Sequence, residues 1–433
     1  MKYYLSQSEG NDSQTGTSPQ SAWSTLQKVA AFDFKPGDVL NLKCGDEWFG
    51  PLILGGVPAA SPMPPVTVRH YGHGPLPKIT GYKTILPQAW SRVSLKIWRV
   101  YINDPRSTSG ATQQNGSFGA NIGFLLIDGK IFGAKKFTLN GLTTQWDFYS
   151  DEDNEVLYVF ADDAPSSVAT VVKAAPRYQN GLLPSRIGTS YCGLEISGSG
   201  SHGWQGTDLI TDVIIRDCYI HEIGGSRLYG STRYGNGIEL YGRGSRIRAE
   251  FNEISDCYDT ATTLQGPGII NAFDGWYDCH YDNNIIRRCN QCFEFWGQYS
   301  RRAGAGVPQS GSGWHRCSFS NNICFDTGYG WSANVRPDVN SKSPLLTYNV
   351  ECDVVDIEIS NNTYINWAGA LWFSNVKTVS QLISRGVKWH NESCIVGPNR
   401  KIEWQLKATM EAWEAYAASL NIRGGSVRII SDK

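Results

Sequence analysis

The second half of the chain repeats one pattern of apolar and polar positions. Five segments begin with alternating apolar residues, a pattern that predicts half-buried β-strands: VIIRDCYI (213–220), IRAEFNEI (247–254), CHYDNNII (279–286), CSFSNNIC (317–324) and IEISNNTY (357–364). Each reaches a turn residue five positions after its first residue: Cys218, Asn252, Asn284, Asn322 and Asn362. Such units cannot bury their apolar faces alone, so they are expected to stack as coils of a solenoid, with the Asn side chains hydrogen-bonded from coil to coil.

Each repeat also contains a second candidate strand. These segments are GIELYG (237–242), ATTLQG (261–266), CFEFWG (292–297), GWSANV (330–335) and GALWFS (369–374). Alternation predicts one outward column of Glu239, Thr263, Glu294, Ser332 and Leu371. A second predicted column contains Tyr241, Gln265, Trp296, Asn334 and Phe373. The extra length of the coils follows these strands, at 266–276, 298–313 and 335–353, so we expect a groove: an outward sheet bordered by long loops.

Other segments differ from the repeats. Residues 19–32 are expected to form an amphipathic helix with Trp23, Leu26 and Ala30 on one face, capped by Ser18 or Ser21. WDFYSDEDNEVLYVFADD predicts a hairpin with a polar turn at 151–154, inside an inserted β subdomain. A helix over 402–420 should bury Leu406, Met410, Trp413, Ala417 and Leu420 near the C-terminal end of the solenoid. The expected parts are a cap and first coils (1–94), the subdomain (95–175), the main solenoid (176–400) and a helical tail (401–433).

Composition excludes some classes of protein. Lys and Arg total 39 against 40 Asp and Glu, and this balance argues against a dedicated nucleic-acid binder. No apolar run reaches the length of a membrane span. The 46 Gly and 21 Tyr, with only 3 Met, favour a turn-rich β protein.

The eleven cysteines do not form a recognisable zinc motif. Cys289 and Cys292 make one CxxC pair, but no second pair or His follows at finger spacing. We therefore expect free thiols buried at inward strand positions, which suits a reducing compartment. The opening MKYYLSQSEGNDSQ also lacks the layout of a secretory signal. A polysaccharide substrate would instead suit an extracellular, periplasmic or virion location, so the localisation stays open.

The motifs resemble the right-handed parallel β-helix proteins of the pectate-lyase-like superfamily, particularly its carbohydrate-active branch. YYLSQSEGNDSQTGTSPQSAWSTLQKV and FKPGDVLNLKCGDEWFG resemble its N-terminal cap and first coils, and the hairpin is similar to the inserted element of β-helical glycoside hydrolases. The resemblance implies an all-β, right-handed parallel β-helix with a cap helix, an inserted β subdomain and a C-terminal helix. It also implies a bacterial or plant polysaccharide as partner. The superfamily includes lyases, hydrolases, epimerases and phage tailspikes, so the fold alone leaves the chemistry open.

The first outward column contains two acids, Glu239 and Glu294. Hydrolysis of a glycosidic bond uses two carboxyl groups. Two rungs separate their backbones by roughly 9.6 Å, near the upper end of the range typical of inverting enzymes. Neighbouring aromatic residues would desolvate one carboxyl and raise its pKa. The column therefore predicts an inverting glycoside hydrolase, with Asp259 in CYDTA and Asp274 in NAFDGW as alternative catalytic partners.

The second outward column has side chains suited to sugars. Aromatic rings stack on sugar rings and amides bind hydroxyls, so Tyr241, Gln265, Trp296 and Asn334 are candidate substrate-binding residues. Trp276 and Trp314 border the long loops. We expect them to act either as sugar platforms or as loop anchors. No cofactor is expected for hydrolysis.

Two other functions remain open. A polysaccharide lyase would need a base and a positive charge or Ca²⁺ for the uronate, and Arg301, Arg302, Arg336 and His202 are its candidates. The outward columns contain no Lys or Arg, and the acidic turn at 151–153 lacks the pattern of a Ca²⁺ loop. A non-catalytic glycan-binding or tailspike module is the third possibility. The oligomeric state is not predicted.

Overall fold

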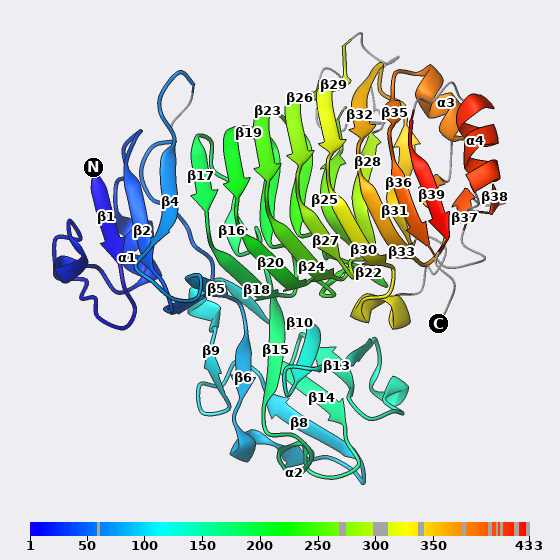
Figure 1. Ribbon diagram of the computed structural model, residues 1–433. Helices are drawn as coiled ribbons and strands as arrows, with labels where there is room; N and C mark the ends of the chain where they lie inside the picture. Colours follow the sequence, from blue (N-terminus) through cyan, green and yellow to red (C-terminus); the bar gives the residue numbers. More distant parts are fainter. Residues whose placement is uncertain are drawn as a thin grey trace, which may run out of the picture.

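The chain winds into a parallel β-helix with three faces (Figure 1). The computed structural model describes residues 1–58, 61–267, 274–297, 311–336, 342–374, 378–396, 401–403, 406–407, 410–419 and 424–429. Within them, strands from successive coils pair in parallel, in sheets of 15 and 10 strands. The predicted all-β parallel β-helix is confirmed.

The three faces follow one another in every central coil. The first face contains β25 (Thr260–Gln265), β28 (Gln291–Gly297), β31 (Ser343–Val350) and β34 (Trp372–Ser374). The second contains β26 (Gly275–Asp282), β29 (Gly313–Ser320), β32 (Val354–Ser360) and β35 (Lys388–His390). Two long strands, β19 (Trp204–Arg216) and β23 (Ile238–Glu250), run through both faces.

The third face forms the 10-stranded sheet. Its strands are β3 (Glu47–Phe49), β5 (Lys78–Thr80), β18 (Glu195–Ser199), β20 (Tyr219–Ile223), β24 (Glu253–Cys257), β27 (Ile285–Arg287), β30 (Ile323–Thr327), β33 (Thr363–Trp367), β36 (Ser393–Val396) and β39 (Ser426–Ile429). The N-terminal coils contribute β1 (Lys2–Leu5), β2 (Val39–Lys43), β4 (Val66–Tyr71), β16 (Leu183–Pro184) and β17 (Thr189–Cys192) to the larger sheet.

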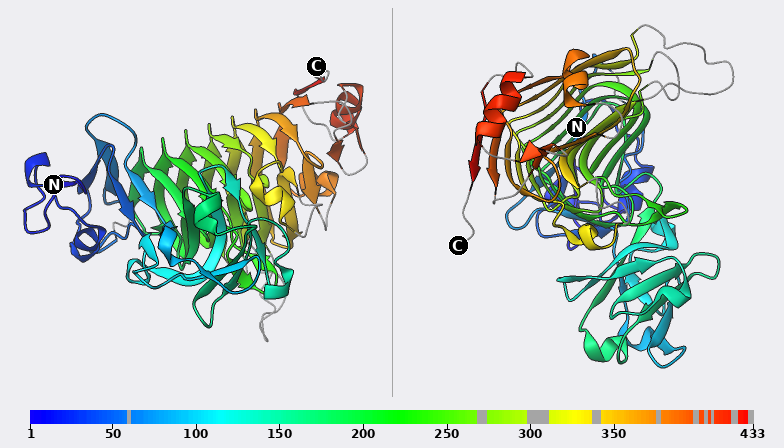
Figure 2. Two further views of the ribbon diagram at one scale, coloured as in Figure 1. Left: turned by 90° about the horizontal axis from the view of Figure 1, so that it is seen from below. Right: turned by 90° about the vertical axis from the view of Figure 1, so that its right-hand side faces the viewer.

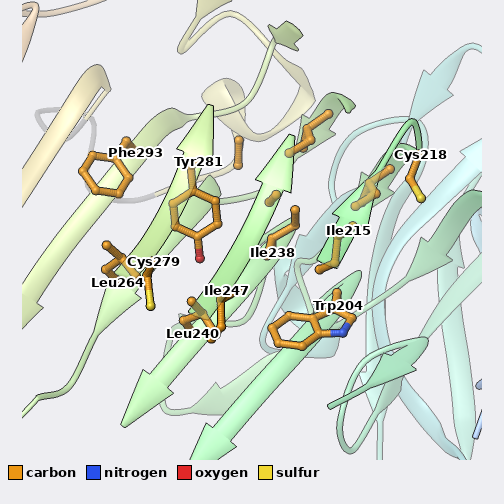
Figure 3. Packing of buried hydrophobic residues seen from close by; sticks show 14 of the residues in the cluster. Trp204, Ile215, Cys218, Ile238, Leu240, Ile247, Leu264, Cys279, Tyr281 and Phe293 are labelled. Carbon is orange, nitrogen blue, oxygen red and sulfur yellow. The ribbon is translucent and has the colours of Figure 1, made fainter. Parts of the chain in front are cut away.

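Inward side chains form continuous apolar columns along the helix (Figure 3). On the first face, strand register aligns Ile238, Thr262, Phe293, Leu345 and Trp372, and all five are buried. Stacking identical faces removes from water the apolar surface that a single coil would expose. This packing is the main source of stability of the solenoid.

The predicted asparagine ladder is confirmed. The side-chain oxygen of each Asn accepts the backbone N–H of the turn residue one coil earlier, at 2.8–3.0 Å, along Cys218, Asn252, Asn284, Asn322 and Asn362. The ladder has one more rung than the sequence predicted, formed by Glu392. Glu392 accepts the amide of Asn362 at 3.3 Å, and complete burial raises its pKa to about 8.

The fourth coil differs from the expected alignment. Segment 330–335 contains no strand: η5 (Trp331–Asn334) is a short 3-10 helix. The extra residues precede the first-face strand, which is β31, so Ser332 and Asn334 lie outside the outward columns. Register pairs Glu294 with Leu346 and Leu346 with Phe373, so Phe373 takes the place in the first column that was predicted for Leu371. The physical reason is that the indole of Trp331 stacks on Phe132, with ring centroids 5.1 Å apart.

The inserted β subdomain projects from one side of the β-helix (Figures 1 and 2). One sheet contains β6 (Lys83–Ile85), β9 (Thr108–Gly110), β10 (Ser117–Ile127), β11 (Ile131–Phe132) and β15 (Val172–Tyr178). The other contains β7 (Ser91–Arg92), β8 (Ile97–Tyr101), β12 (Ala134–Lys136), β13 (Asp147–Asp151) and β14 (Val156–Phe160). The predicted hairpin is the antiparallel pair β13–β14. Because β6 pairs with β15, the insert begins upstream of the expected residue 95.

A glycine allows the insert to approach the coils closely. A Cβ atom on Gly123 of β10 would lie 2.0 Å from the backbone oxygen of Gly224 and 2.8 Å from the Cα of Gly200. No side chain fits there, so a substitution would push the insert away from the β-helix.

The helices at the two ends are shorter than expected. In the segment 19–32, η1 (Pro19–Ser21) is capped by Ser18 and α1 (Leu26–Ala31) is capped by Thr25. Trp23 lies between them in a bridge to Leu5, so it is buried but not helical. Other short elements are α2 (Pro165–Val168), β21 (Arg227–Tyr229), β22 (Thr232–Arg233), α3 (Val379–Ser384) and the 3-10 helices η2 (Pro87–Ala89), η3 (Gln113–Asn115) and η4 (Leu139–Gly141).

The predicted C-terminal helix is α4 (Met410–Ser419), which contacts β39. Residues 401–407 include two short strands, β37 (Lys401–Glu403) and β38 (Leu406–Lys407), because an antiparallel pair replaces the first helical turns. Ala417 is buried as expected, whereas the side chains of Leu406, Met410, Trp413 and Leu420 lie outside the described residues. No helix in the described part of the chain is long and apolar enough to cross a membrane.

All eleven cysteines are free, and ten of them are buried. Burial also raises thiol pKa values, to about 12 for Cys218, which suppresses the reactive thiolate. Thiol titration of the native protein should therefore detect few groups, chiefly the partly exposed Cys192, and all eleven after denaturation. Cys192→Ser should remove most of the native signal. Rapid labelling of all eleven in the native protein would contradict the prediction.

Candidate active site

Two acidic side chains share one outward column of the first face. Strand register places Gln205, Glu239, Thr263 and Glu294 on successive rungs of β19, β23, β25 and β28. The predicted alignment of Glu239, Thr263 and Glu294 was therefore correct. Both Glu side chains are almost fully buried, with 5% of Glu239 and 4% of Glu294 exposed. Nearly buried carboxyl groups on an outward face are unusual, because most outward acids are solvated.

Hydrogen bonds hold Glu239 in a fixed position. One of its carboxylate oxygens accepts hydrogen bonds from the amide of Asn236 and, at 3.1 Å, from the hydroxyl of Thr263. Burial raises the pKa of Glu239 to about 7, although these two donors act in the opposite direction. This carboxyl group can therefore exchange a proton near neutral pH.

Glu294 has a matching set of partners. Its carboxylate accepts the amide of Gln265 at 2.8 Å and the hydroxyl of Thr260 at 3.2 Å. Burial, together with the negative charges of Asp259 and Glu239, raises the pKa of Glu294 well above its usual range. The two Glu side chains are thus close enough to influence each other's ionisation.

Asp259 stands at the beginning of β25, beside the two Glu residues. Its carboxylate forms an ion pair with Arg336, with 2.5 Å between Oδ1 and Nη1. The side chain of Asp259 is 23% exposed, and its charge raises the pKa of both Glu239 and Glu294. Asp259 and Arg336 therefore belong to the site, as an ion pair at its edge.

Asp274 lies at the opposite end of the strand pair. It is buried and forms an ion pair with Arg243 at 3.1 Å. Both residues line a separate pocket of about 210 Å³ on the second face, with Leu209 and Tyr277. Asp259 precedes β25 and Asp274 follows it along the chain, and the ion pair with Arg243 holds Asp274 beside the second face.

Two residues support Glu239: Asn236, which sequence reasoning missed, and His202, which it named only as a lyase candidate. Asn236 lies in a turn before β23, so it belongs to no strand column that could reveal it. Nδ1 of His202 lies 4.0 Å from the Glu239 carboxylate and accepts the backbone N–H of Asn236 at 3.1 Å. Burial lowers the pKa of His202 to about 4, so the ring is neutral at pH 7 with its proton on Nε2. Neutral His202 therefore lies beside the Glu239 carboxyl group without adding a positive charge.

The second outward column provides aromatic and amide groups. Register aligns Tyr241, Gln265 and Trp296, and the rings of Tyr241 and Trp296 lie 5.9 Å apart. Both rings are partly exposed, whereas Gln265 is buried and engaged with Glu294. Tyr241 and Trp296 thus border the carboxyl pair on its solvent side.

Trp276 and Trp314 are not sugar platforms. Both are fully buried in the core, and their indole N–H groups donate to the backbone oxygens of Gln265 and Leu264 at 3.0 Å. They anchor the beginnings of β26 and β29 beneath the first face, so their rings offer no surface to a ligand. Arg301 and Arg302 lie outside the described residues. Within the described ranges, no three His, Cys, Asp or Glu side chains are grouped to hold a metal ion.

Comparison with known proteins finds similarity only in structure. No family model matches the sequence, and no curated protein matches it. XylC in complex with xylose is 14% identical, with a TM-score of 0.47, and the match covers 99% of this chain and 83% of that one. The native GH136 lacto-N-biosidase from Eubacterium ramulus is 9% identical, with a TM-score of 0.49 and coverage of 99% and 68%. Pectate lyase Pel9A is 11% identical, with a TM-score of 0.47 and coverage of 100% and 78%. Similarity at this level does not distinguish hydrolysis from elimination.

Proposed function

We propose that the protein is a glycoside hydrolase that cleaves a polysaccharide or oligosaccharide on the first face of the β-helix. The observation that carries this proposal is the pair Glu239 and Glu294: two buried carboxyl groups on one column, each held by two hydrogen-bond donors and each with a raised pKa. Glycoside hydrolysis needs two carboxyl groups in different protonation states.

The spacing of the pair supports inversion. One rung, that of Thr263, separates Glu239 from Glu294, so their backbones are roughly 9.6 Å apart at about 4.8 Å per rung. Inverting enzymes keep their carboxyl groups about 6.5–9.5 Å apart, which leaves room for a water molecule, whereas retaining enzymes need about 5–5.5 Å. A sugar above Thr263 would have one carboxyl group on each side.

The environments of the two acids suggest their roles. The pKa of Glu294 is raised by burial and by two neighbouring negative charges, so this residue keeps its proton and donates it to the leaving oxygen. Glu239, with a pKa of about 7, is the partner that activates water as the base. Tyr241 and Trp296 would stack against the sugar rings beside the pair.

Elimination is the alternative reaction. It needs a base such as Lys, Arg, His or Tyr and a positive charge against the uronate carboxylate. Tyr241 of the second outward column is a candidate base, but the described residues of the two columns include no Lys or Arg to bind the uronate, and Arg336 is already paired with Asp259. His202 is buried behind Glu239. The first face therefore favours hydrolysis over elimination.

Product analysis tests the proposed function. The enzyme is incubated with a panel of neutral and acidic polysaccharides while reducing ends and the ultraviolet absorbance of unsaturated uronates are followed. Hydrolysis predicts reducing ends without absorbance, and proton NMR of the first product should show the anomer inverted from the substrate. Reducing ends together with absorbance would establish a lyase. A substrate that binds tightly but yields neither signal would indicate a glycan-binding or tailspike module.

A further inference from the structure

We propose that Arg177 forms a subsite for an acidic substituent of the sugar chain, a carboxylate or a sulfate ester. The subsite lies where the inserted β subdomain meets the β-helix, outside the carboxyl pair. This inference rests on the proposed function, because it adds a substrate class to the same groove: an acidic glycan.

Two aromatic rings hold the guanidinium group in place. Arg177 lies near the end of β15, and its Cζ is 4.8 Å from the ring centre of Phe118 on β10 and 4.7 Å from that of Tyr234. In Figure 1, β10 and β15 reach up from the insert to the β-helix. Phe118 comes from the insert and Tyr234 from a turn of the coils, so the docking of the two parts creates the sandwich. A stacked guanidinium is oriented in advance and loses little freedom when it binds an anion.

No acid neutralises Arg177. Two arginines close to the insert or to the carboxyl pair have carboxylate partners: Arg227 pairs with Glu152 and Arg336 with Asp259. For Arg177, the described residues provide no hydrogen-bond acceptor, and its Nε is buried without a partner. A buried donor without a partner is costly, and planar guanidinium groups bind carboxylate and sulfate-type oxygens in a bidentate manner.

A cavity opens beside this guanidinium. It has a volume of about 450 Å³, within the usual range for small-ligand sites, and its lining includes Arg177, Phe118, Ser117 and Asn121. Two acids also line it: Glu152 is paired with Arg227, whereas Glu155 accepts the amide of Gln113 at 2.8 Å, a neutral donor that leaves its charge unpaired. Arg177 is the only positively charged side chain among the described residues that line this cavity.

Contacts connect the cavity to the carboxyl pair. Tyr234, which covers Arg177, packs edge-on against His202 with ring centres 5.4 Å apart. His202 in turn lies 4.0 Å from the carboxylate of Glu239. The charge of Arg177 is close enough to lower the pKa of His202. Arg177 is therefore separated from Glu239 by only two side chains, Tyr234 and His202. A sugar chain cleaved at Glu239 that crosses the partly exposed Tyr234 would place an acidic group at Arg177.

Direct binding of monosaccharides tests the subsite. Glucuronate, glucose 6-sulfate and glucose are titrated into the wild-type protein and into Arg177→Met, with ligand-observed NMR as the readout. We expect both anions to bind the wild type more tightly than glucose does. Arg177→Met should weaken them by on the order of tenfold or more, because a charge-assisted hydrogen bond is lost.

Controls separate this proposal from the hydrolase proposal. Arg99→Met removes an arginine that stacks on Tyr101 in the same insert, and it should leave anion binding unchanged. Glu239→Gln should also keep anion binding, so the subsite can stand even if the carboxyl pair proves inactive. If Arg177→Met unfolds, Arg177→Lys keeps the charge but loses the stacked plane, and should weaken binding. Equal affinity for glucose and both anions, or unchanged binding in the folded Arg177 variants, would overturn the proposal.

Discussion

Glu294→Gln and Glu239→Gln should each lower the hydrolysis rate by about 10²- to 10⁴-fold, because each removes a proton-transfer group while keeping its size. The glutamine can still accept hydrogen bonds from the donors that hold the native carboxylate, so the fold should be preserved. Initial rates on the true substrate measure the effect, and circular dichroism verifies folding.

The leaving group distinguishes the two roles. In an aryl glycoside with a dinitrophenolate leaving group, that group leaves without being protonated. The Glu294→Gln enzyme should therefore recover most of its activity on such a substrate. Glu239→Gln should stay impaired, since the water still lacks its base. Glu250→Gln provides the matched control: it lies on the same strand, β23, but on the second face, and should be fully active. Near-normal activity of both site variants on the natural substrate would refute the assignment and direct attention to Asp259.

Asn284→Ala should destabilise the protein by about 3 kcal/mol or more, because it interrupts the asparagine ladder at its centre. The Asn284 oxygen accepts both the backbone N–H and the side-chain amide of Asn252 at 3.0 Å. Its own amide donates to the backbone oxygen of Ala249 at 2.9 Å and to the side chain of Asn322 at 3.1 Å. Alanine removes all four hydrogen bonds and leaves the buried backbone N–H of Asn252 without its acceptor. Urea unfolding followed by tryptophan fluorescence measures the loss.

The neighbouring residue supplies the control for the ladder. Asn283 is exposed and has a φ of 60°, a left-handed conformation that glycine adopts without strain. Asn283→Gly should therefore change the free energy of unfolding by much less than Asn284→Ala does. Equal effects of the two substitutions would show that the turn conformation, and not the ladder, stabilises the coil.

The sequence alone determined the features that repeat. Identical positions in successive coils stack directly, so the spacing of Asn252, Asn284, Asn322 and Asn362 was sufficient to predict the ladder. The same alternation aligned Glu239, Thr263 and Glu294 correctly, because each of them stands between two inward, buried residues of its own strand. Strand register in a parallel β-helix follows from local pattern, since neighbouring rungs are consecutive coils.

Only the tertiary structure decided features that depend on contacts between distant segments. The extra residues of the fourth coil could precede or follow its first-face strand. Trp331 packs on the insert, so these residues precede the strand and Asn334 lies outside the second outward column. By sequence, Trp276 at a loop margin was either a sugar platform or a loop anchor; the structure buries it completely, with its indole N–H bonded to Gln265. Arg177 meets Tyr234 only because the insert docks on the coils, and local periodicity contains no information about such docking.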